Sequence, residues 1–158
     1  MINISYRKLQ REESRIYRTI RLESLEKFPE SFGATYQEAV NIEKFRIESD
    51  IEEQTPERFV FGAFAQHELV GICTFVKNEN NTGSIYQMYV KREFQGKNIG
   101  QGLIEAVIAE ASQKFNRIEI ILEVTPGNDK AYNLYRKIGF QEIPHISPEE
   151  ICMKYVPK

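Results

Sequence analysis

The chain has 158 residues, of which 41% are hydrophobic and 28% are charged, and its formal net charge is −2. This length predicts one domain over residues 1–158 and is too short for two comfortable ones. The small charge gives no electrostatic footprint for nucleic acid. No apolar run is long enough to cross a bilayer and the N-terminus has no signal-peptide pattern, so we expect a cytoplasmic protein without a membrane partner.

The positions of the cysteines and histidines favour a reducing compartment and no metal site. Cys73 and Cys152 are the only cysteines, and each sits in an apolar, strand-like run. We expect two buried thiols in a reducing compartment, with a disulfide or a reactive thiol as the alternative. The two histidines are far apart, so no metal-ligand cluster is visible and no metal is expected. His67 falls in a short turn between two apolar runs and is expected to be exposed.

Apolar periodicity and turn residues divide the chain into strands and helices. Period-two alternation predicts strands, and apolar residues on one face at a 3.6 period predict helices. Pro29 stops the first helix and Gly139 ends the last. The predicted elements are a strand over 2–9, a helix over 12–28, one weak helix or two short ones over 36–51, strands over 58–65, 69–76 and 84–90, a helix over 100–115, a strand over 117–124, a helix over 128–138, and strands over 140–143 and 151–156. This order predicts an α/β fold with one mixed sheet.

The stretch from Ser84 to Gly102 is the most informative part of the chain. A β-branched and aromatic run leads into a glycine-rich loop and then directly into an apolar-periodic helix. Gly96, Gly100 and Gly102 leave room for an anion to approach the backbone, and asparagine at position 98 tolerates positive φ. Helical N–H groups and the macrodipole converge at such a helix start. The loop is therefore predicted to hold a pyrophosphate.

Two other phosphate-binding patterns fit the loop poorly. A P-loop needs Gly-Lys-Ser/Thr, but Lys97 lies inside the loop and no serine or threonine follows Gly100 or Gly102. The dinucleotide fingerprint needs a different glycine spacing in a first βα turn. A glycine-rich turn without a ligand is the remaining structural alternative.

Two segments resemble signatures of the Gcn5-related N-acetyltransferase (GNAT) superfamily. Gln95-Gly96-Lys97-Asn98-Ile99-Gly100-Gln101-Gly102-Leu103 is similar to its Gln/Arg-x-x-Gly-x-Gly/Ala signature. The segment from Asn128 to Phe140 is similar to its Asn-x-x-Ala-x-x-Leu-Tyr-x-x-x-Gly-Phe segment. Asn98 stands where the family usually has glycine. The resemblance covers about Val60 to the C-terminus.

This resemblance implies the acyl-CoA N-acyltransferase fold, a mostly antiparallel sheet with splayed central strands flanked by helices. It implies acetyl-CoA as co-substrate, with its pyrophosphate on the loop amides and its pantetheine arm along the strand Met88–Val90. The Met88 amide would polarise the acetyl carbonyl as an oxyanion donor. The cofactor-binding residues that it implies are Met88, Val90, Gln95, Gly96, Lys97, Asn98, Ile99, Gly100, Gln101, Gly102 and Asn128.

Two catalytic candidates follow from the same resemblance. Tyr135 would be the general acid that protonates the departing thiolate, or it simply packs in its helix. Glu123, in a Leu-Glu-Val segment, resembles the proposed base of the ribosomal-protein N-terminal acetyltransferases. The alternative for Glu123 is a solvated glutamate on an edge strand. Asn128 is expected to cap the following helix, with contact to the pantetheine as a second role.

The acceptor site is expected to come from residues 25–40 and the loop near 143–150. Phe28, Phe32 and Tyr36 line it or belong to the core. Acidic residues in this half would suit an amine substrate, although the same pattern is typical of a solvated helix face. These acids are Glu23, Glu26, Glu30 and Glu38.

The sequence therefore predicts an N-acetyltransferase that moves the acetyl group of acetyl-CoA to a primary amine by direct attack in a ternary complex. The acceptor is left open between a small molecule, an amino acid and a peptide. The alternatives are a non-catalytic acyl-CoA sensor and a transferase that uses another acyl-CoA. Exposed strands near the C-terminus also favour a homodimer.

Overall fold

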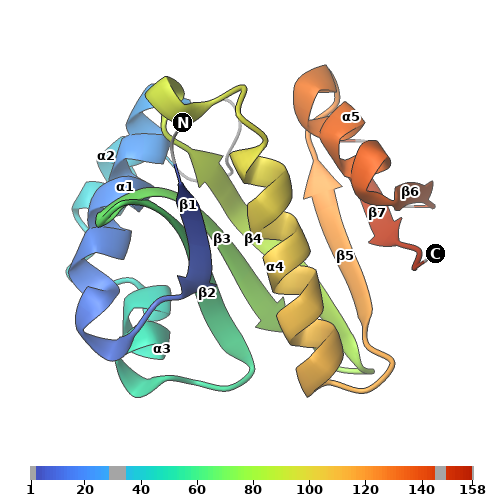
Figure 1. The fold of residues 1–158 in the computed structure, drawn as a ribbon, viewed down its shortest axis with the longest axis horizontal. Coiled ribbons are helices and arrows are strands. Elements are labelled where there is room, and N and C mark those ends of the chain that lie inside the picture. The colour runs from blue at the N-terminus through green and yellow to red at the C-terminus, as the bar shows by residue number, and fades with distance from the viewer. Residues whose placement is uncertain (1–2, 29–34, 145–148, 158) are drawn as a thin grey trace.

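The computed structural model describes residues 3–28, 35–144 and 149–157 (Figure 1). The strands are β1 (Ile4–Lys8), β2 (Arg58–Ala65), β3 (Glu68–Lys77), β4 (Thr82–Val90), β5 (Glu119–Val124), β6 (Phe140–Ile143) and β7 (Ile151–Tyr155). The helices are α1 (Ser14–Lys27), α2 (Tyr36–Val40), α3 (Arg46–Glu53), α4 (Ile99–Lys114) and α5 (Asp129–Ile138), with short 3-10 turns at η1 (Arg11–Glu13) and η3 (Arg92–Phe94). The predicted order of elements is confirmed, and the weak second helix is two short helices.

In the described residues, the strands form a 7-stranded sheet in the order β1-β2-β3-β4-β5-β7-β6. Neighbouring strands run antiparallel except β4 and β5, which are parallel. Helices α4 and α5 pack on one face, and α1 and α3 pack on the other (Figure 1). The predicted mixed, mostly antiparallel sheet flanked by helices is confirmed.

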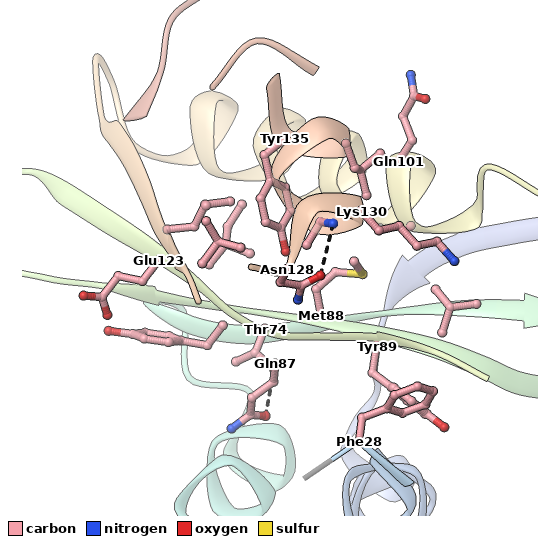
Figure 2. A pocket seen from close by; sticks show the side chains of 18 of the residues that line it. Phe28, Thr74, Gln87, Met88, Tyr89, Gln101, Glu123, Asn128, Lys130 and Tyr135 are labelled. Atoms are coloured by element: carbon pink, nitrogen blue, oxygen red, sulfur yellow. Dashed lines mark hydrogen bonds between the residues drawn. The ribbon is translucent and has the colours of Figure 1, made fainter. Parts of the chain in front are cut away.

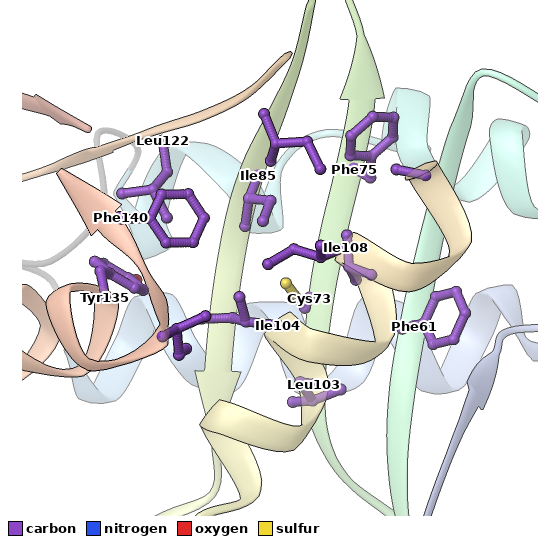
Figure 3. Close-up of a cluster of buried hydrophobic side chains, with 14 of the residues drawn as sticks. Phe61, Cys73, Phe75, Ile85, Leu103, Ile104, Ile108, Leu122, Tyr135 and Phe140 are labelled. Carbon is purple, nitrogen blue, oxygen red and sulfur yellow. The ribbon is translucent and has the colours of Figure 1, made fainter. Parts of the chain in front are cut away.

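The central strands β2 and β3 are buried on both faces of the sheet. Successive side chains of a strand point to opposite faces, so Cys73 belongs to the core under α4, whereas Ile72 belongs to the core under α1 and α3. On the α4 side, Leu103 and Ile104 of α4 belong to the same core cluster as Phe75 of β3 (Figure 3). This double burial explains why β2 and β3 read as almost continuous apolar runs.

The two cysteines and His67 lie in the surroundings that the sequence predicts. Cys73 and Cys152 are both buried free thiols, as predicted. His67 is exposed in the turn between β2 and β3, also as predicted. None of the helices in the described residues combines the length and the apolar character needed to cross a membrane.

Strands β4 and β5 separate in the middle of the sheet. Their pairing is confined to Thr82–Ser84 against Glu119–Ile121, although β4 continues to Val90 and β5 to Val124. Beyond Ser84, β4 has lost its neighbour on this side, and β5 pairs only with β7. The predicted splay of the central strands is therefore confirmed, and it opens a passage through the sheet.

Strand β4 also carries a bulge that the apolar pattern does not reveal. Thr74 pairs with Tyr86 and Ile72 pairs with Tyr89, so Gln87 and Met88 both lie opposite Cys73. Gln87 has a φ of 57°, in the left-handed region. A bulge of this kind redirects side chains and backbone groups locally. Here it lies where β4 faces the splay.

Candidate active site

The glycine-rich loop between β4 and α4 adopts the backbone conformation expected of an anion cradle. Gly96 has a φ of 79° and Asn98 a φ of 63°. An added side chain at Gly96 would meet no atom within 4 Å, so the space in front of the loop is open. Asn98 is the N-cap residue of α4. The predicted tolerance of Asn98 for positive φ is thus realised.

The N–H groups at the two ends of this loop already donate to carbonyl groups, and the N–H groups between them are available. The Gln95 N–H donates to the Arg92 carbonyl at 3.2 Å, and the Gly102 N–H donates to the Asn98 carbonyl at 3.1 Å. The amides of residues 96–101 belong to the loop and to the first helical turn, where N–H groups have no intrahelical acceptor. These donors sit at the positive end of the α4 dipole.

The sequence predicts glycine at position 102 for the approach of an anion, but the structure gives a different reason, which is packing. A Cβ at this position would lie 2.3 Å from the ring of Tyr6, which is on β1. Neither Gly102 nor Lys97 is among the described residues that line the cavity described below. Gly102 therefore makes room for the packing of α4 against β1.

A cavity of about 1150 Å³ extends from this loop through the splay to the opposite face of the sheet. Its wall on the α4 side includes the residues that the sequence predicts as cofactor-binding, except Lys97 and Gly102. They are Met88, Val90, Gln95, Gly96, Asn98, Ile99, Gly100, Gln101 and Asn128. This volume is slightly above the roughly 300–1,000 Å³ typical of small-molecule sites.

Several side chains fix the shape of the cavity near the loop. Gly100 lies between Met88 and Leu134, since a Cβ there would be 3.4 Å from the Met88 Cε and 3.5 Å from the Leu134 Cδ2. Gln95 Nε2 donates to the Val90 carbonyl at 2.9 Å, which ties the loop to the end of β4. Asn128 accepts from the Ala131 N–H at 3.4 Å and caps α5, as predicted.

Tyr135 reaches into the cavity from α5. Its side chain is buried, its ring packs edge-on against Phe140, and Figure 2 shows it pointing toward Asn128 and Met88. Burial, with a smaller contribution from Cys73, raises the pKa of Tyr135 above its ordinary value. The phenol therefore keeps its proton at neutral pH and can act as a hydrogen-bond donor or a proton source.

Glu123 lines the same cavity from β5 but lies on the other face of the sheet. Leu122 and Val124 belong to the buried core under α4, and Glu123 between them is exposed. The structure thus brings Glu123 and Tyr135 to one cavity, on opposite sides of the splay. Figure 2 shows the Glu123 carboxylate directed away from the tyrosine.

A polar cluster at the bulge is absent from the sequence predictions. The Tyr17 hydroxyl donates to Gln87 Oε1 at 2.7 Å, and the Thr74 hydroxyl donates to the same oxygen at 3.2 Å. Gln87 and Thr74 both line the cavity. These residues come from α1, β3 and β4, so only the folded chain brings them together.

The acceptor side of the cavity differs from the expectation in its charged residues. Phe28 lines it as expected, but Tyr36 is not among the described lining residues. Glu23 binds Tyr89 and Lys91, Glu38 binds Thr35, and neither these nor Glu26 line the cavity. Phe32 and Glu30 lie outside the described residues. The three acids that the structure describes are therefore not part of the described lining, which favours the alternative of a solvated helix face over a role at the amine.

The described residues contain no group of three or more histidine, cysteine, aspartate or glutamate side chains that could hold a metal ion. Among the described lining residues, the cavity offers backbone amides, the buried phenols of Tyr89 and Tyr135, and a few charged groups.

Comparison with curated proteins gives partial matches to acetyltransferases. The N-alpha-acetyltransferase of Sulfurisphaera tokodaii is 33% identical over 61 residues, which are 39% of this chain and 36% of that protein. The probable spermine N(1)-acetyltransferase of Bacillus subtilis subsp. natto is 24% identical over 87 residues, which are 51% of this chain and 57% of that protein. The matched region is thus between 36% and 57% of the length of these relatives.

The fold is shared with solved acetyltransferase structures. The PaiA N-acetyltransferase from Thermoplasma acidophilum, determined in complex with coenzyme A, superposes with a TM-score of 0.71 at 23% identity. The superposition covers 97% of this chain and 98% of that one. A model of the acetyltransferase (GNAT) family also matches residues 21–140, which is most of the chain. The protein therefore belongs to the acetyltransferase (GNAT) family.

Proposed function

We propose that the protein is an N-acetyltransferase that transfers the acetyl group of acetyl-CoA to a primary amine within a ternary complex. The observation that carries this proposal is the continuous cavity. It joins the amide-rich start of α4 to the phenol of Tyr135 and then passes between β4 and β5. The complex of coenzyme A with the Thermoplasma acidophilum protein, which shares the fold, supports the choice of donor.

In this proposal the donor lies along the α4 side of the splay. The amides of residues 96–101 would bind its pyrophosphate, because they are unused and lie at the positive end of a helix. The unpaired edge of β4 from Met88 to Val90 would bind the pantetheine arm by strand addition. Asn128 borders the same space, although its side-chain oxygen already caps α5.

The reaction then needs a neutral amine, a stabilised oxyanion and a proton for the thiolate. The amine nitrogen attacks the thioester carbonyl carbon and forms the C–N bond, while the Met88 amide at the bulge donates to the developing oxyanion. The C–S bond breaks, and the Tyr135 hydroxyl gives its proton to the thiolate. The proton lost from the amine passes to Glu123, directly or through water, and Tyr135 regains its proton from solvent.

The proposal has two further features, a location in the cell and an assembly state. A cytoplasmic location is supported by the two buried free thiols, which suit a reducing compartment. A homodimer is supported by β6, which lies at the edge of the sheet and offers unpaired backbone groups.

The test combines binding with turnover. Calorimetry should give saturable binding of acetyl-CoA, and an assay of free thiol should report release of CoA with a panel of amino acids, polyamines and peptides with free N-termini. Mass spectrometry of the amine should show the acetylated product. Binding without thiol release from any amine would instead support the non-catalytic sensor. A faster reaction with another acyl-CoA would assign a different donor.

A further inference from the structure

Gln87, in the bulge of β4, has a side-chain amide whose orientation is fixed by two buried hydroxyl groups. Its Oε1 atom accepts hydrogen bonds from the Tyr17 hydroxyl at 2.7 Å and from the Thr74 hydroxyl at 3.2 Å. Tyr17 is 1% exposed and Thr74 is 0% exposed, and neither hydroxyl has another acceptor among the described residues. An amide turned over, with its nitrogen toward the hydroxyls, would leave both hydroxyl protons buried without an acceptor, which is unfavourable. The oxygen of Gln87 therefore faces α1.

The Nε2 group of Gln87 is an unpaired donor that opens into the cavity. It has no hydrogen-bond acceptor in the part of the chain that the structure describes. Over the same residues, no fully buried side-chain nitrogen or oxygen lacks a partner, so Nε2 is reached from the cavity that Gln87 lines. Because Oε1 already accepts two hydrogen bonds, Gln87 offers a ligand only its N–H groups.

This donor lies close to the point where the proposed reaction takes place. Gln87 and Met88 are consecutive residues of the bulge, and consecutive Cα atoms are about 3.8 Å apart. The Met88 side chain lies beside Gly100 on the α4 side, whereas the Gln87 side chain points to the opposite side of the strand, toward α1 (Figure 2). An oxygen bound by Gln87 would thus be only a few covalent bonds from the nitrogen that attacks beside the Met88 amide.

A fixed N–H donor at this place selects for an acceptor molecule with an oxygen near its amine. A carbonyl oxygen next to the amine can accept from Nε2 and hold the attacking nitrogen in place. A polyamine cannot do so, because its further amines are protonated at neutral pH and present only N–H donors. Since Tyr17 and Thr74 already order the amide of Gln87, little rotamer freedom is lost when the ligand binds.

Resting on the proposed acetyl transfer, we infer that the acceptor carries a carbonyl oxygen beside the amine that is acetylated, and that Gln87 Nε2 donates a hydrogen bond to this oxygen. Free amino acids, amino-acid amides and peptides with a free N-terminus share this oxygen and form the class. Amines without a neighbouring carbonyl, polyamines included, lie outside it.

The first test compares matched acceptors with the intact chain and saturating acetyl-CoA. For alanine, leucine, phenylalanine and lysine, the panel contains the amino acid, its amide, a tripeptide that begins with it and the amine left by decarboxylation. Spermine is added as the polyamine. Mass spectrometry quantifies each acetylated product, and the three carbonyl-bearing forms distinguish an amino acid, an amide and a peptide as the source of the oxygen.

The rates are compared as kcat/KM for the neutral amine. A neighbouring carbonyl lowers the amine pKa from about 10.4 toward about 8, which alone would favour the carbonyl-bearing forms. After this correction we expect the best carbonyl-bearing acceptor to exceed its decarboxylated amine at least about tenfold, as loss of one hydrogen bond to a fixed donor predicts. A smaller ratio, or a preference for spermine, overturns the inference.

Gln87→Glu tests the residue itself. The carboxylate keeps an oxygen for Tyr17 and Thr74 but replaces the N–H donor with a second oxygen, which repels a carbonyl oxygen and attracts N–H groups. The preference for the amide over its amine should therefore fall about tenfold or more, while the Kd for acetyl-CoA stays within about twofold of the parent value. Gln66→Glu is the matched control and should leave the preference unchanged, because Gln66 also has a left-handed φ, 59°, but is exposed in the turn between β2 and β3.

The outcomes separate the inference from the proposed function. An unchanged preference in Gln87→Glu, with a melting temperature and a Kd for acetyl-CoA close to the parent values, overturns the role of Gln87. If that variant does not fold, the acceptor panel with the parent protein decides the inference by itself. Transfer to simple amines as efficiently as to their carbonyl-bearing forms overturns the inference but leaves N-acetyltransferase activity standing. Absence of acetyl-CoA binding, or of thiol release with any amine, overturns the proposed function and the inference with it.

Discussion

The hydroxyl of Tyr17 on α1 donates a 2.7 Å hydrogen bond to the side-chain carbonyl of Gln87 at the bulge of β4. This bond joins the first helix to the strand that borders the splay. Gln87 holds a left-handed backbone conformation, which is uncommon for a residue other than glycine. Such a conformation persists only when its surroundings hold it, and the hydrogen bonds from Tyr17 and Thr74 anchor the side chain of this residue.

We therefore predict that Tyr17→Phe impairs catalysis more than binding of the donor. Loss of one net hydrogen bond should lower the free energy of unfolding by about 1 kcal/mol. Because the bulge then orients the Met88 amide less precisely, kcat should fall about tenfold while the Kd for acetyl-CoA is unchanged. Urea unfolding, calorimetry and steady-state kinetics measure the three quantities. Tyr155→Phe is the control; an unchanged kcat in Tyr17→Phe would limit the network to a packing role.

The sequence predicts the element order and the loop well because both depend on local patterns. Period-two and 3.6-residue repeats locate strands and helices, and the tolerance of Asn98 for positive φ follows from its short polar side chain. The bulge is not predictable in this way, since nothing in Tyr86-Gln87-Met88 favours a left-handed glutamine.

Local sequence patterns also do not predict the polar cluster at the bulge. Tyr17, Thr74 and Gln87 meet only after α1, β3 and β4 have packed, so their spacing in the chain carries no signal. For a related reason, the sequence leaves open whether the N-terminal acids line the site or only face solvent. Glu23 accepts a hydrogen bond from Tyr89 and forms an ion pair with Lys91, and it does not line the cavity. Composition alone does not reveal these contacts.

We predict that Gly102→Ala destabilises the fold but does not weaken donor binding. The added Cβ would lie 2.3 Å from the Tyr6 ring, and overpacking of this kind costs about 1–3 kcal/mol. Tyr6→Leu in the same chain should recover part of that loss. Denaturant unfolding and calorimetry with acetyl-CoA check both points. If the affinity falls and the stability does not, Gly102 belongs to the cofactor site after all.

We predict that Glu123→Gln lowers kcat about 10- to 100-fold at neutral pH without changing the Kd for acetyl-CoA. The amide cannot take the proton that the amine must lose, and general base catalysis typically contributes about 10²–10⁴-fold. Glu119→Gln is the matched control, because Glu119 is exposed on the same strand and binds Lys154. Equal rates for Glu123→Gln and the parent would leave Glu123 as a solvated glutamate.

We predict a loss of stability at alkaline pH. Burial raises the pKa of Tyr17, Tyr135 and Cys73 above ordinary values of 10.0 for tyrosine and 9.0 for cysteine. The unfolded chain therefore loses these protons first, so the stabilisation is complete below pH 9 and declines as the pH rises above 9 to 10. Each group costs up to about 1.4 kcal/mol per pH unit. Urea unfolding from pH 8 to 11 measures the decline, and Tyr135→Phe should make it shallower; a flat profile contradicts the assignment.

We propose above all that Tyr135 donates the proton to the thiolate of an acetyl-CoA held in the splay. The most direct measurement compares acetyl-CoA binding and the rate of thiol release in Tyr135→Phe. Tyr132→Phe on the same helix, which removes the hydrogen bond from Tyr132 to Glu142, is the control. We predict a Kd within about twofold of the parent and a kcat lower by about 10²-fold or more. A Tyr135→Phe variant that transfers acetyl groups at the parent rate would contradict the account.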